Sequence, residues 1–445
     1  MLSEEPHLTI GIHETRRVRI TFEGSFQVQD ARRTIGGAAA ARLEADGVVL
    51  ETESGIIINA RELTLAPTDN ATFTLHDVTI GKQFHWQREE DQRFHGNLQL
   101  RRSGELILAI NRIGVEAYLT SVISSEMGAD GSIEFLKAHA ITSRSWLLAQ
   151  LELSRALKNG SRLRIPTLYQ EAGRIIRWYD REDHDLFDVC ADDHCQRYQG
   201  TTKAFTPAVE QAVRDTRGMV LMNGDEICDA RFSKSCGGVS ELFENAWGAD
   251  HHDYLIPVRD QEGETLPDLT DEQTAIAWIV SSPPSYCNVT DPAVIRRILP
   301  SVDRETVDSY RWTVTYSQEE LAEIIKKKSG IDFGEIVGLV PVRRGPSGRI
   351  VELHIQGTKT SLVVGKELEI RRFLSPAHLY SSAFVVETEP TVNGIPSRFT
   401  FRGAGWGHGV GLCQIGAGVM GEHGFSCEDI LRHYFPGSAL GRLYR

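Results

Sequence analysis

The sequence lacks several features that define broad classes of protein. It has no run of about 18 apolar residues, so we expect no membrane-spanning helix. It also has no cluster of basic residues. Its 48 Lys and Arg are outnumbered by 61 Asp and Glu, which gives a formal net charge of −13. This acidic balance disfavours nucleic acid and other polyanionic partners, whereas an uncharged glycan is compatible with it.

The chain also lacks a disulfide pattern and a secretion signal. Its seven cysteines are odd in number and are not spaced as in small secreted proteins, which favours free thiols or metal ligands. The first residues, MLSEEPHLTIGI, are acidic and contain no apolar signal-peptide core. We therefore expect either a cytoplasmic protein or a chain from which a leader has been removed.

Two helices are predicted between Asn111 and Glu152. Apolar residues at a 3,1,3,1 spacing mark one face of the first helix, and a breaker cluster at residues 128–131 should end it. Ser132 is the predicted N-cap of the second helix. The inward-facing residues are Val115, Tyr118, Leu119, Val122 and Ile123, and then Ile133, Leu136, Ala140, Ile141, Leu147 and Leu148.

Glu126 stands at the C-terminal end of the first predicted helix. The partial negative charge of a helix C-terminus disfavours an ionised carboxylate, and Ile123 and Met127 would add desolvation. Both effects suit a carboxylic acid that donates a proton near neutral pH. From position alone, the plainer interpretation is an exposed charge at a helix end.

The residues around Glu126 follow a family motif. The segment Y-L-x-x-V-I-x-S-E-M, followed by L-K-A-x-A-I-x-x-R, resembles the stage II sporulation protein D family, also called the amidase-enhancer family. Members act on bacterial peptidoglycan. The resemblance implies that Glu126 is the catalytic acid of a lytic transglycosylase, with Ser125 and Arg144 in the substrate site. His139 stands where the family usually has Gln, a departure that affects a polar contact and not the acid.

A second block, from Tyr198 to Gly248, is similar to the same family and is implied to line the substrate groove. The residues support this independently. Paired glycines permit a close backbone approach to a ligand, Ser supplies a partner for sugar hydroxyls, and Trp supplies a stacking face. Without the resemblance, residues 232–238 would read as a β-hairpin turn. The candidate substrate-binding residues of this block are Tyr198, Ser235, Gly237, Gly238 and Trp247.

The third block is dense in glycine, with nine glycines between Gly403 and Gly424. It lacks the spacing of a dinucleotide-binding fingerprint. It resembles the family's C-terminal signature G-x-G-x-G-H-G-V-G-x-x-Q-x-G-A, in which Cys413 replaces a common Ser. Here His408 and Gln414 are candidate substrate-binding residues. His408 is equally compatible with a hydrogen-bonded core histidine.

Four potential metal ligands lie within twelve residues: His184, Cys190, His194 and Cys195. Thiolate and imidazole are the ligand types that zinc prefers, although the spacing is not that of a zinc finger. Some members of the family carry zinc just downstream of the catalytic helix, which this arrangement loosely resembles. The alternative is a set of buried thiols and surface histidines.

The remaining chain indicates the fold. Residues 1–110 contain short alternating segments, such as 8–12, 18–22, 63–65 and 98–100, which predict an antiparallel β platform. Residues 262–400 read as a compact inserted αβ segment, with a helix at 318–328 and strands at 351–355 and 361–364. We therefore predict an α+β fold. A β-rich platform (1–110) precedes a catalytic domain (111–445) that has a central helix pair and the insertion.

The predicted function is cleavage of peptidoglycan glycan strands as a lytic transglycosylase, which needs only one acid/base group. Ordinary glycosidases usually need two carboxylates. Two rivals stay open. One is a non-catalytic glycan-binding protein that stimulates an amidase, as the family's second name suggests. The other is a zinc hydrolase built on His184 and the nearby cysteines. A cell-envelope location is implied by the resemblance alone.

Overall fold

The computed structural model describes residues 4–29, 33–44, 47–81, 87–163, 165–179, 184–202, 206–263, 265–300, 303, 309–389 and 393–445. The fold is of mixed α+β type, as predicted, and forms two compact units. Unit 1 comprises Met1–Asp130, Asp183–Gly218 and Arg442–Arg445, and unit 2 comprises Gly131–Glu182 and Met219–Gly441. The proposed boundary at residue 110 and the insertion at 262–400 stay predictions. Among the described residues, no helix is both long and apolar enough to pass through a bilayer.

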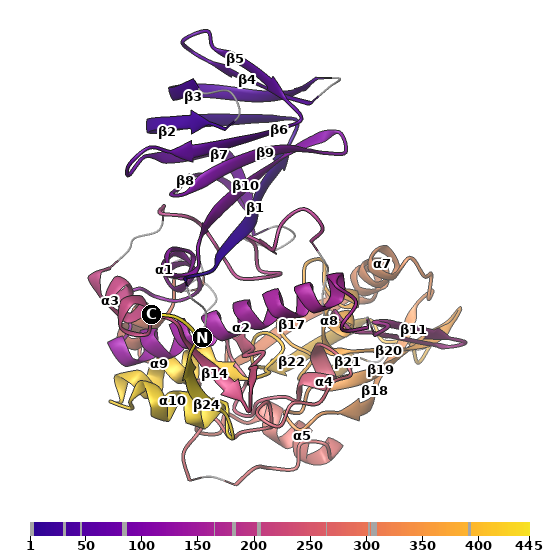
Figure 1. Cartoon of the computed structure of the whole chain (residues 1–445). Helices are drawn as coiled ribbons and strands as arrows, with labels where there is room; N and C mark the ends of the chain where they lie inside the picture. Colours follow the sequence, from indigo (N-terminus) through magenta and orange to yellow (C-terminus); the bar gives the residue numbers. More distant parts are fainter. Residues whose placement is uncertain are drawn as a thin grey trace. The chain divides into compact units, whose positions relative to one another are not determined.

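Unit 1 is built on a β-sheet that confirms the strands expected in the first 110 residues. Within the described residues the sheet has 11 strands, in the order β13-β1-β10-β9-β6-β2-β3-β4-β5, with β7 pairing with β2 and β8 (Figure 1). The strands are β1 (His7–Thr15), β2 (Arg17–Val28), β3 (Arg33–Glu44), β4 (Gly47–Thr52), β5 (Ile57–Ala60), β6 (Glu62–Pro67), β7 (Thr72–Ile80), β8 (Arg88–Phe94), β9 (Asn97–Ser103), β10 (Leu106–Gly114) and β13 (Val189–Cys190).

Side chains that alternate between buried and exposed explain why these segments form strands. In β2, Val18, Ile20 and Phe22 are buried, while Arg17 and Arg19 face solvent. All strand pairs of this sheet are antiparallel except one: β13 pairs in parallel with β1, which places Cys190 opposite Gly11 at the sheet edge. The helices of unit 1 are α1 (Val115–Glu126) and α3 (Pro207–Asp215).

Unit 2 contains the second predicted helix, α2 (Ile133–Lys158). As expected, the Ser132 side chain caps it by accepting a hydrogen bond from the Phe135 N–H. The two predicted helices thus belong to different units. The other helices are α4 (Phe243–Ala246), α5 (Glu272–Val280), α6 (Pro292–Ile298), α7 (Gln318–Ser329), α8 (Glu367–Phe373), α9 (Gln414–Glu422) and α10 (Cys427–Tyr434).

Several smaller sheets complete unit 2. Their orders are β11-β12-β20-β19-β18, β15-β14-β24, β16-β23 and β17-β22-β21. The strands are β11 (Leu168–Glu171), β12 (Arg174–Arg177), β14 (Met219–Asn223), β15 (Glu226–Ile227), β16 (Phe232–Ser233), β17 (Arg311–Ser317), β18 (Ile336–Arg344), β19 (Ile350–Gly357), β20 (Ser361–Gly365), β21 (Phe384–Glu389), β22 (Arg398–Ala404), β23 (Leu412–Cys413) and β24 (Ala439–Arg442).

The helix and strands predicted in the 262–400 segment are confirmed as α7, β19 and β20. A capping box between Ser317 and Glu320 starts α7, and Gly330 ends it in the left-handed conformation. Leu321 and Ile325 of α7 lie in an apolar core together with Leu353 and Ile355 of β19. The hairpin interpretation of residues 232–238 is wrong, because β16 pairs in parallel with the distant β23.

The last residues of the chain, 442–445, belong to unit 1. The Leu443 N–H donates to the Gly218 carbonyl over 2.9 Å. The Tyr444 hydroxyl donates to Oε1 of Glu116, on α1, over 2.6 Å. Glu116 also accepts a hydrogen bond from the Gly218 N–H. The first turn of the helix that ends at Glu126 is thus held by Tyr444, which lies 328 positions after Glu116 in the chain.

Candidate active site

Glu126 is the last residue of α1, and its side chain is buried, with 8% of the residue exposed. The interpretation as an exposed helix-end charge is therefore wrong. The backbone N–H of Arg197 donates a hydrogen bond of 2.9 Å to Oε1 of Glu126. The carboxyl group is thus oriented by a backbone donor, so a change of side chain at position 197 leaves this contact possible.

The segment that carries Arg197 is fixed to α1 at two further points. The Tyr118 hydroxyl donates to Oε1 of Gln196 over 3.1 Å, and the Gln199 N–H donates to the Ser121 hydroxyl over 3.2 Å. Residues 118, 121 and 126 all belong to α1, so the segment 196–199 lies against this helix. Glu126 is therefore held in a defined position by the helix and by this segment together.

Asp193 supplies a second, half-buried carboxylate close to Glu126. Nε of Arg197 donates to Oδ1 of Asp193 over 2.5 Å. Burial raises the pKa of Asp193 to about 6, and the nearby Glu126 carboxylate acts in the same direction, while Arg197 opposes both. In the same segment, the Asp192 backbone carbonyl accepts a hydrogen bond from the Cys195 N–H.

His184, Cys190, His194 and Cys195 lie together in unit 1, and one ligand atom from each is within 4.8 Å of the others. We call this set the His/Cys quartet. Sγ of Cys195 is 3.4 Å from Nε2 of His184 and 3.4 Å from Nδ1 of His194, and Sγ of Cys190 is 3.9 Å from the same Nδ1. Ligands of a tetrahedral zinc ion lie about 3.6 Å apart for sulfur and nitrogen, so these residues fit zinc.

The quartet and Glu126 are joined by the chain itself. Cys195 is two residues before Arg197, whose N–H holds Glu126. The thiol of Cys190 is a strong ligand candidate. Hydrogen bonding from Cys195 lowers the pKa of Cys190 against the effect of burial, and His184 and His194 lower it further. A metal bound here would fix the segment that orients the carboxyl group.

Two other predicted residues of unit 1 have different surroundings. Tyr198 is fully buried, stacks on Tyr118 with ring centroids 5.1 Å apart, and donates from its hydroxyl to Asn111. Ser125 is also buried, at 5% exposure. The contacts of Tyr198 hold the 196–199 segment against the sheet and α1.

His408, in unit 2, is held by backbone groups at both ring nitrogens. Its Nε2–H donates to the Phe232 carbonyl over 2.9 Å, and its Nδ1 accepts from the Val410 N–H over 3.0 Å. Burial, with Arg231 and Arg349 nearby, holds the pKa of His408 well below its usual range. Trp247 packs edge-on against His408 at 4.9 Å between ring centroids. These contacts match the alternative of a hydrogen-bonded core histidine.

The other predicted residues of unit 2 are also buried. A guanidinium nitrogen of Arg144 donates to the Met219 carbonyl, and the Gln414 amide lies 3.0 Å from Nε2 of His139. Ser235 forms an isolated bridge with Trp406. A Cβ atom at Gly237 would lie 2.9 Å from the Gly405 nitrogen, and one at Gly238 would lie 2.8 Å from the Trp278 ring. Both glycines therefore allow other segments of unit 2 to pack closely against the chain.

Residues 103–223 match the model of a family described as "Stage II sporulation protein". This range includes α1, α2, Glu126 and the His/Cys quartet.

The chain carries a stage II sporulation protein domain.

Further residues, 241–411, match a family described only as a domain of unknown function. Three relatives cover most of this chain at low identity. Stage II sporulation protein D of Bacillus subtilis (strain 168) is 23% identical over 336 residues, which are 75% of this chain and 76% of that protein. An uncharacterized protein of Brachyspira hyodysenteriae is 23% identical over 344 residues, or 77% and 71%. The amidase enhancer of Bacillus subtilis is 24% identical over 333 residues, or 72% of this chain but only 40% of that protein.

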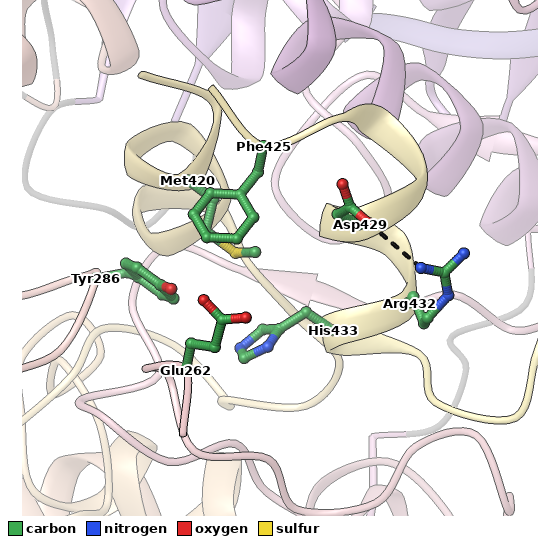
Figure 2. Close-up of a pocket in the computed structure, with 7 residues that line it drawn as sticks. All are labelled: Glu262, Tyr286, Met420, Phe425, Asp429, Arg432 and His433. Carbon is green, nitrogen blue, oxygen red and sulfur yellow. Dashed lines mark hydrogen bonds and ion pairs between the residues drawn. The ribbon is translucent and has the colours of Figure 1, made fainter. Parts of the chain in front are cut away.

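Outside the stage II sporulation protein domain, unit 2 contains a pocket of about 400 Å³ that sequence reasoning missed (Figure 2). Tyr286 and Phe425 form aromatic walls with ring centroids 6.0 Å apart, and Arg432 donates to Asp429 at the rim. The lining residues come from positions 262 and 286 and from residues 420–433. Because these segments are far apart in the sequence, no motif could indicate the pocket. The lining residues are Glu262, Tyr286, Met420, Phe425, Asp429, Arg432 and His433.

Proposed function

We propose that this protein cleaves the glycan strands of peptidoglycan as a lytic transglycosylase, with Glu126 as the acid and base. The observation that carries the proposal is the position of Glu126. It is a buried carboxyl group at a helix C-terminus, oriented by the Arg197 N–H, inside the stage II sporulation protein domain. A carboxyl group held in one orientation inside the protein is placed to exchange a proton with a bound substrate.

The reaction requires one carboxyl group used twice. Glu126 donates its proton to the glycosidic oxygen between N-acetylmuramic acid and N-acetylglucosamine as the bond from C1 to that oxygen breaks. The resulting carboxylate then takes the proton of the muramic acid's own 6-hydroxyl, whose oxygen forms a bond to C1. The products are a 1,6-anhydro end and a free hydroxyl on the leaving strand, and Glu126 is protonated again. No water is consumed.

The His/Cys quartet has a supporting part in this proposal. Zinc bound by His184, Cys190, His194 and Cys195 would supply a fixed tetrahedral centre with no open position, which is a structural role. The quartet precedes the segment that contacts Tyr118, Ser121 and Glu126 of α1. These residues hold the acid in place, and the proton transfers use Glu126 alone.

The test is mass spectrometry of glycan strands, with and without stem peptides, after incubation with wild type, Glu126→Gln and Glu116→Gln. Glu116 is the matched control because it is a buried glutamate of the same helix with structural partners. We expect 1,6-anhydro ends from wild type and Glu116→Gln. We expect Glu126→Gln to form these ends at a rate at least about 100-fold lower than wild type. Equal cleavage by wild type and Glu126→Gln would overturn the proposal.

A second candidate is a non-catalytic peptidoglycan binder that stimulates an amidase. One observation favours it, namely the similarity to a protein named amidase enhancer. It predicts that wild type and Glu126→Gln bind strands equally, that neither cleaves them, and that both stimulate an amidase. Cleavage that a chelator abolishes and Glu126→Gln spares would instead indicate a zinc hydrolase.

A further inference from the structure

Four buried side chains of unit 2 converge although they are far apart in the sequence. Cys236, Asp260, Cys287 and Cys413 each present one ligand atom, and these atoms all lie within 4.8 Å of one another. None of the four residues is more than 2% exposed. We call this set the Cys3Asp cluster. It is separate from the His/Cys quartet, which belongs to unit 1.

The distances in the cluster fit a single tetrahedral metal ion. Sγ of Cys236 lies 3.8 Å from Sγ of Cys287, and both thiols are free. Two thiolates about 2.3 Å from one tetrahedral zinc ion are about 3.8 Å apart. A disulfide requires about 2.05 Å between the sulfurs, so this pair is spaced for a shared metal.

Backbone donors point at the sulfur atoms. The N–H of Cys236 donates to Sγ of Cys413 over 3.3 Å, and the N–H of Gly238 donates to Sγ of Cys236 over 3.4 Å. A neutral thiol is a weak acceptor, whereas a thiolate is a good one. Gly237 and Gly238 both have positive φ, of 81° and 109°, which turns the chain so that the Gly238 N–H reaches the sulfur two residues earlier.

Asp260 is oriented in the way typical of a carboxylate that binds metal. Its Oδ1 accepts from the Tyr434 hydroxyl over 2.6 Å, and its Oδ2 accepts from the Cys287 N–H over 2.8 Å. Each carboxylate oxygen has a further lone pair. Outer partners that fix a ligand's orientation are a regular feature of metal sites.

The charges around the Cys3Asp cluster are also compatible with one bound zinc ion. Three thiolates and one carboxylate carry four negative charges, of which a zinc ion offsets two. The guanidinium groups of Arg349 and Arg311 lie beside the cluster: Arg349 donates to the Cys236 carbonyl over 3.0 Å and Arg311 to the Gly237 carbonyl over 3.1 Å. Both lie within electrostatic reach of the Cys236 thiol. The two cations reduce the remaining negative charge around the cluster.

We propose that Cys236, Asp260, Cys287 and Cys413 bind one zinc ion. The three thiols and the carboxylate complete a closed tetrahedral set, so the ion has a structural role. Zinc suits the set because soft thiolates select it, and an oxygen ligand is tolerated as the fourth.

The ion would join segments that carry other features of unit 2. Cys236 follows β16, Cys413 ends β23, and Tyr286, next to Cys287, forms a wall of the pocket in Figure 2. The Tyr286 N–H donates to the Asp260 carbonyl over 2.7 Å. Loss of the ion would therefore loosen the pocket wall and the pairing of β16 with β23.

The experiment measures zinc per chain by plasma mass spectrometry in the full-length protein, after expression with zinc and extensive dialysis. The test variant is Cys287→Ser with Cys413→Ser. The matched control is Cys228→Ser with Cys427→Ser, which removes two buried thiols of unit 2 that belong to neither metal set. We expect the test variant to hold one zinc ion fewer than wild type, and the control to hold as many as wild type.

A second measurement covers the case in which the test variant does not fold. Wild type and the variant Cys190→Ser with Cys195→Ser are loaded with Co²⁺, whose bonds to thiolates give a charge-transfer band. The variant without the quartet thiols is expected to keep one Co²⁺ per chain and this band. Equal zinc in wild type and a folded test variant would overturn the proposal. So would the absence of Co²⁺ from the folded quartet variant, or a Cys236–Cys287 disulfide in folded protein without zinc.

Discussion

At the scale of single residues, His139 shows how a substitution within a family motif is accommodated. The imidazole is fully buried in unit 2, and its Nε2 meets the Gln414 amide. Burial, assisted by the charge of Lys234, lowers the pKa of His139 to about 3. The residue is therefore neutral in the folded protein near pH 7, where it acts as a polar partner much as a glutamine would.

This burial predicts a pH-dependent stability. Above the unfolded pKa of about 6.5, the neutral form is present in both states and the full stability is retained. As the pH falls from 6.5 towards 3, the unfolded chain binds a proton that folded His139 excludes, so stability is lost. Between pH 7 and pH 5 this loss is about 2 kcal/mol for one histidine. We expect His139→Gln to lose less stability over this range than wild type, as measured by urea unfolding at each pH.

The control for this measurement is His423→Gln, which changes an exposed histidine of the same unit. Its pH dependence should match that of wild type. Effects of acid on any bound metal are common to all three proteins and cancel in the comparison. Identical losses in wild type and His139→Gln would contradict the prediction.

At the scale of elements, the glycine-dense segment before α9 packs directly on the segment after β16. A Cβ atom at Gly405 would lie 2.8 Å from the Ser235 carbonyl oxygen and 2.9 Å from the Gly237 nitrogen. Gly405 also has a φ of 77°, where other residues are strained. The two backbones approach closely because neither side carries a side chain at the crossing.

Gly405→Ala is therefore expected to destabilise unit 2 by more than about 3 kcal/mol, because strain at positive φ adds to a clash with backbone atoms. Gly437→Ala is the matched control, since Gly437 has a φ of 81° but open space around it. It should cost about 1 kcal/mol, from backbone strain alone. Urea unfolding of the two variants measures the difference in their free energies of unfolding. Equal losses of stability in both variants would contradict the prediction that the close backbone contact at Gly405 adds to the cost.

Much of the local structure could be predicted because its causes are local. The end of α1 follows from the breakers at 128–131, the start of α2 from Ser132, and the strands of unit 1 from alternating apolar residues. The proximity of His184 to Cys195 follows from a spacing of eleven residues. The burial of Glu126 does not follow from its position at the end of α1, because the segment that covers its carboxyl group comes from Arg197, 71 residues later.

The rest depends on contacts between distant segments. The Cys3Asp cluster joins positions 236, 260, 287 and 413, so no spacing in the sequence marks it. The division of α1 and α2 between two units has the same origin, because chain neighbours separated by a short turn can belong to different cores. The hydrogen bonds of Tyr198 and His408 also join distant segments, so the sequence alone could not identify their partners, Asn111 and the Phe232 carbonyl.

At the scale of the whole molecule, two units with separate cores predict unfolding in more than one step. With zinc at both metal sets, Cys190→Ser with Cys195→Ser should lower the transition of unit 1, and Cys287→Ser with Cys413→Ser that of unit 2. Differential scanning calorimetry, with hydrogen exchange to assign each transition, measures this. A single transition that both variants lower equally would contradict the prediction.

The return of residues 442–445 to unit 1 has a consequence for synthesis on the ribosome. Most of unit 1 is made before residue 219, but the contacts of Leu443 and Tyr444 form only after the intervening 441 − 218 = 223 residues of unit 2. At about 5–20 residues per second, this interval lasts about 10 to 45 s. During that time Glu116 has not yet met the Tyr444 hydroxyl. The nascent unit 1 must therefore persist without this hydrogen bond while residues 219–441 of unit 2 are translated, and α1 acquires its contact with Tyr444 only at the end of that interval.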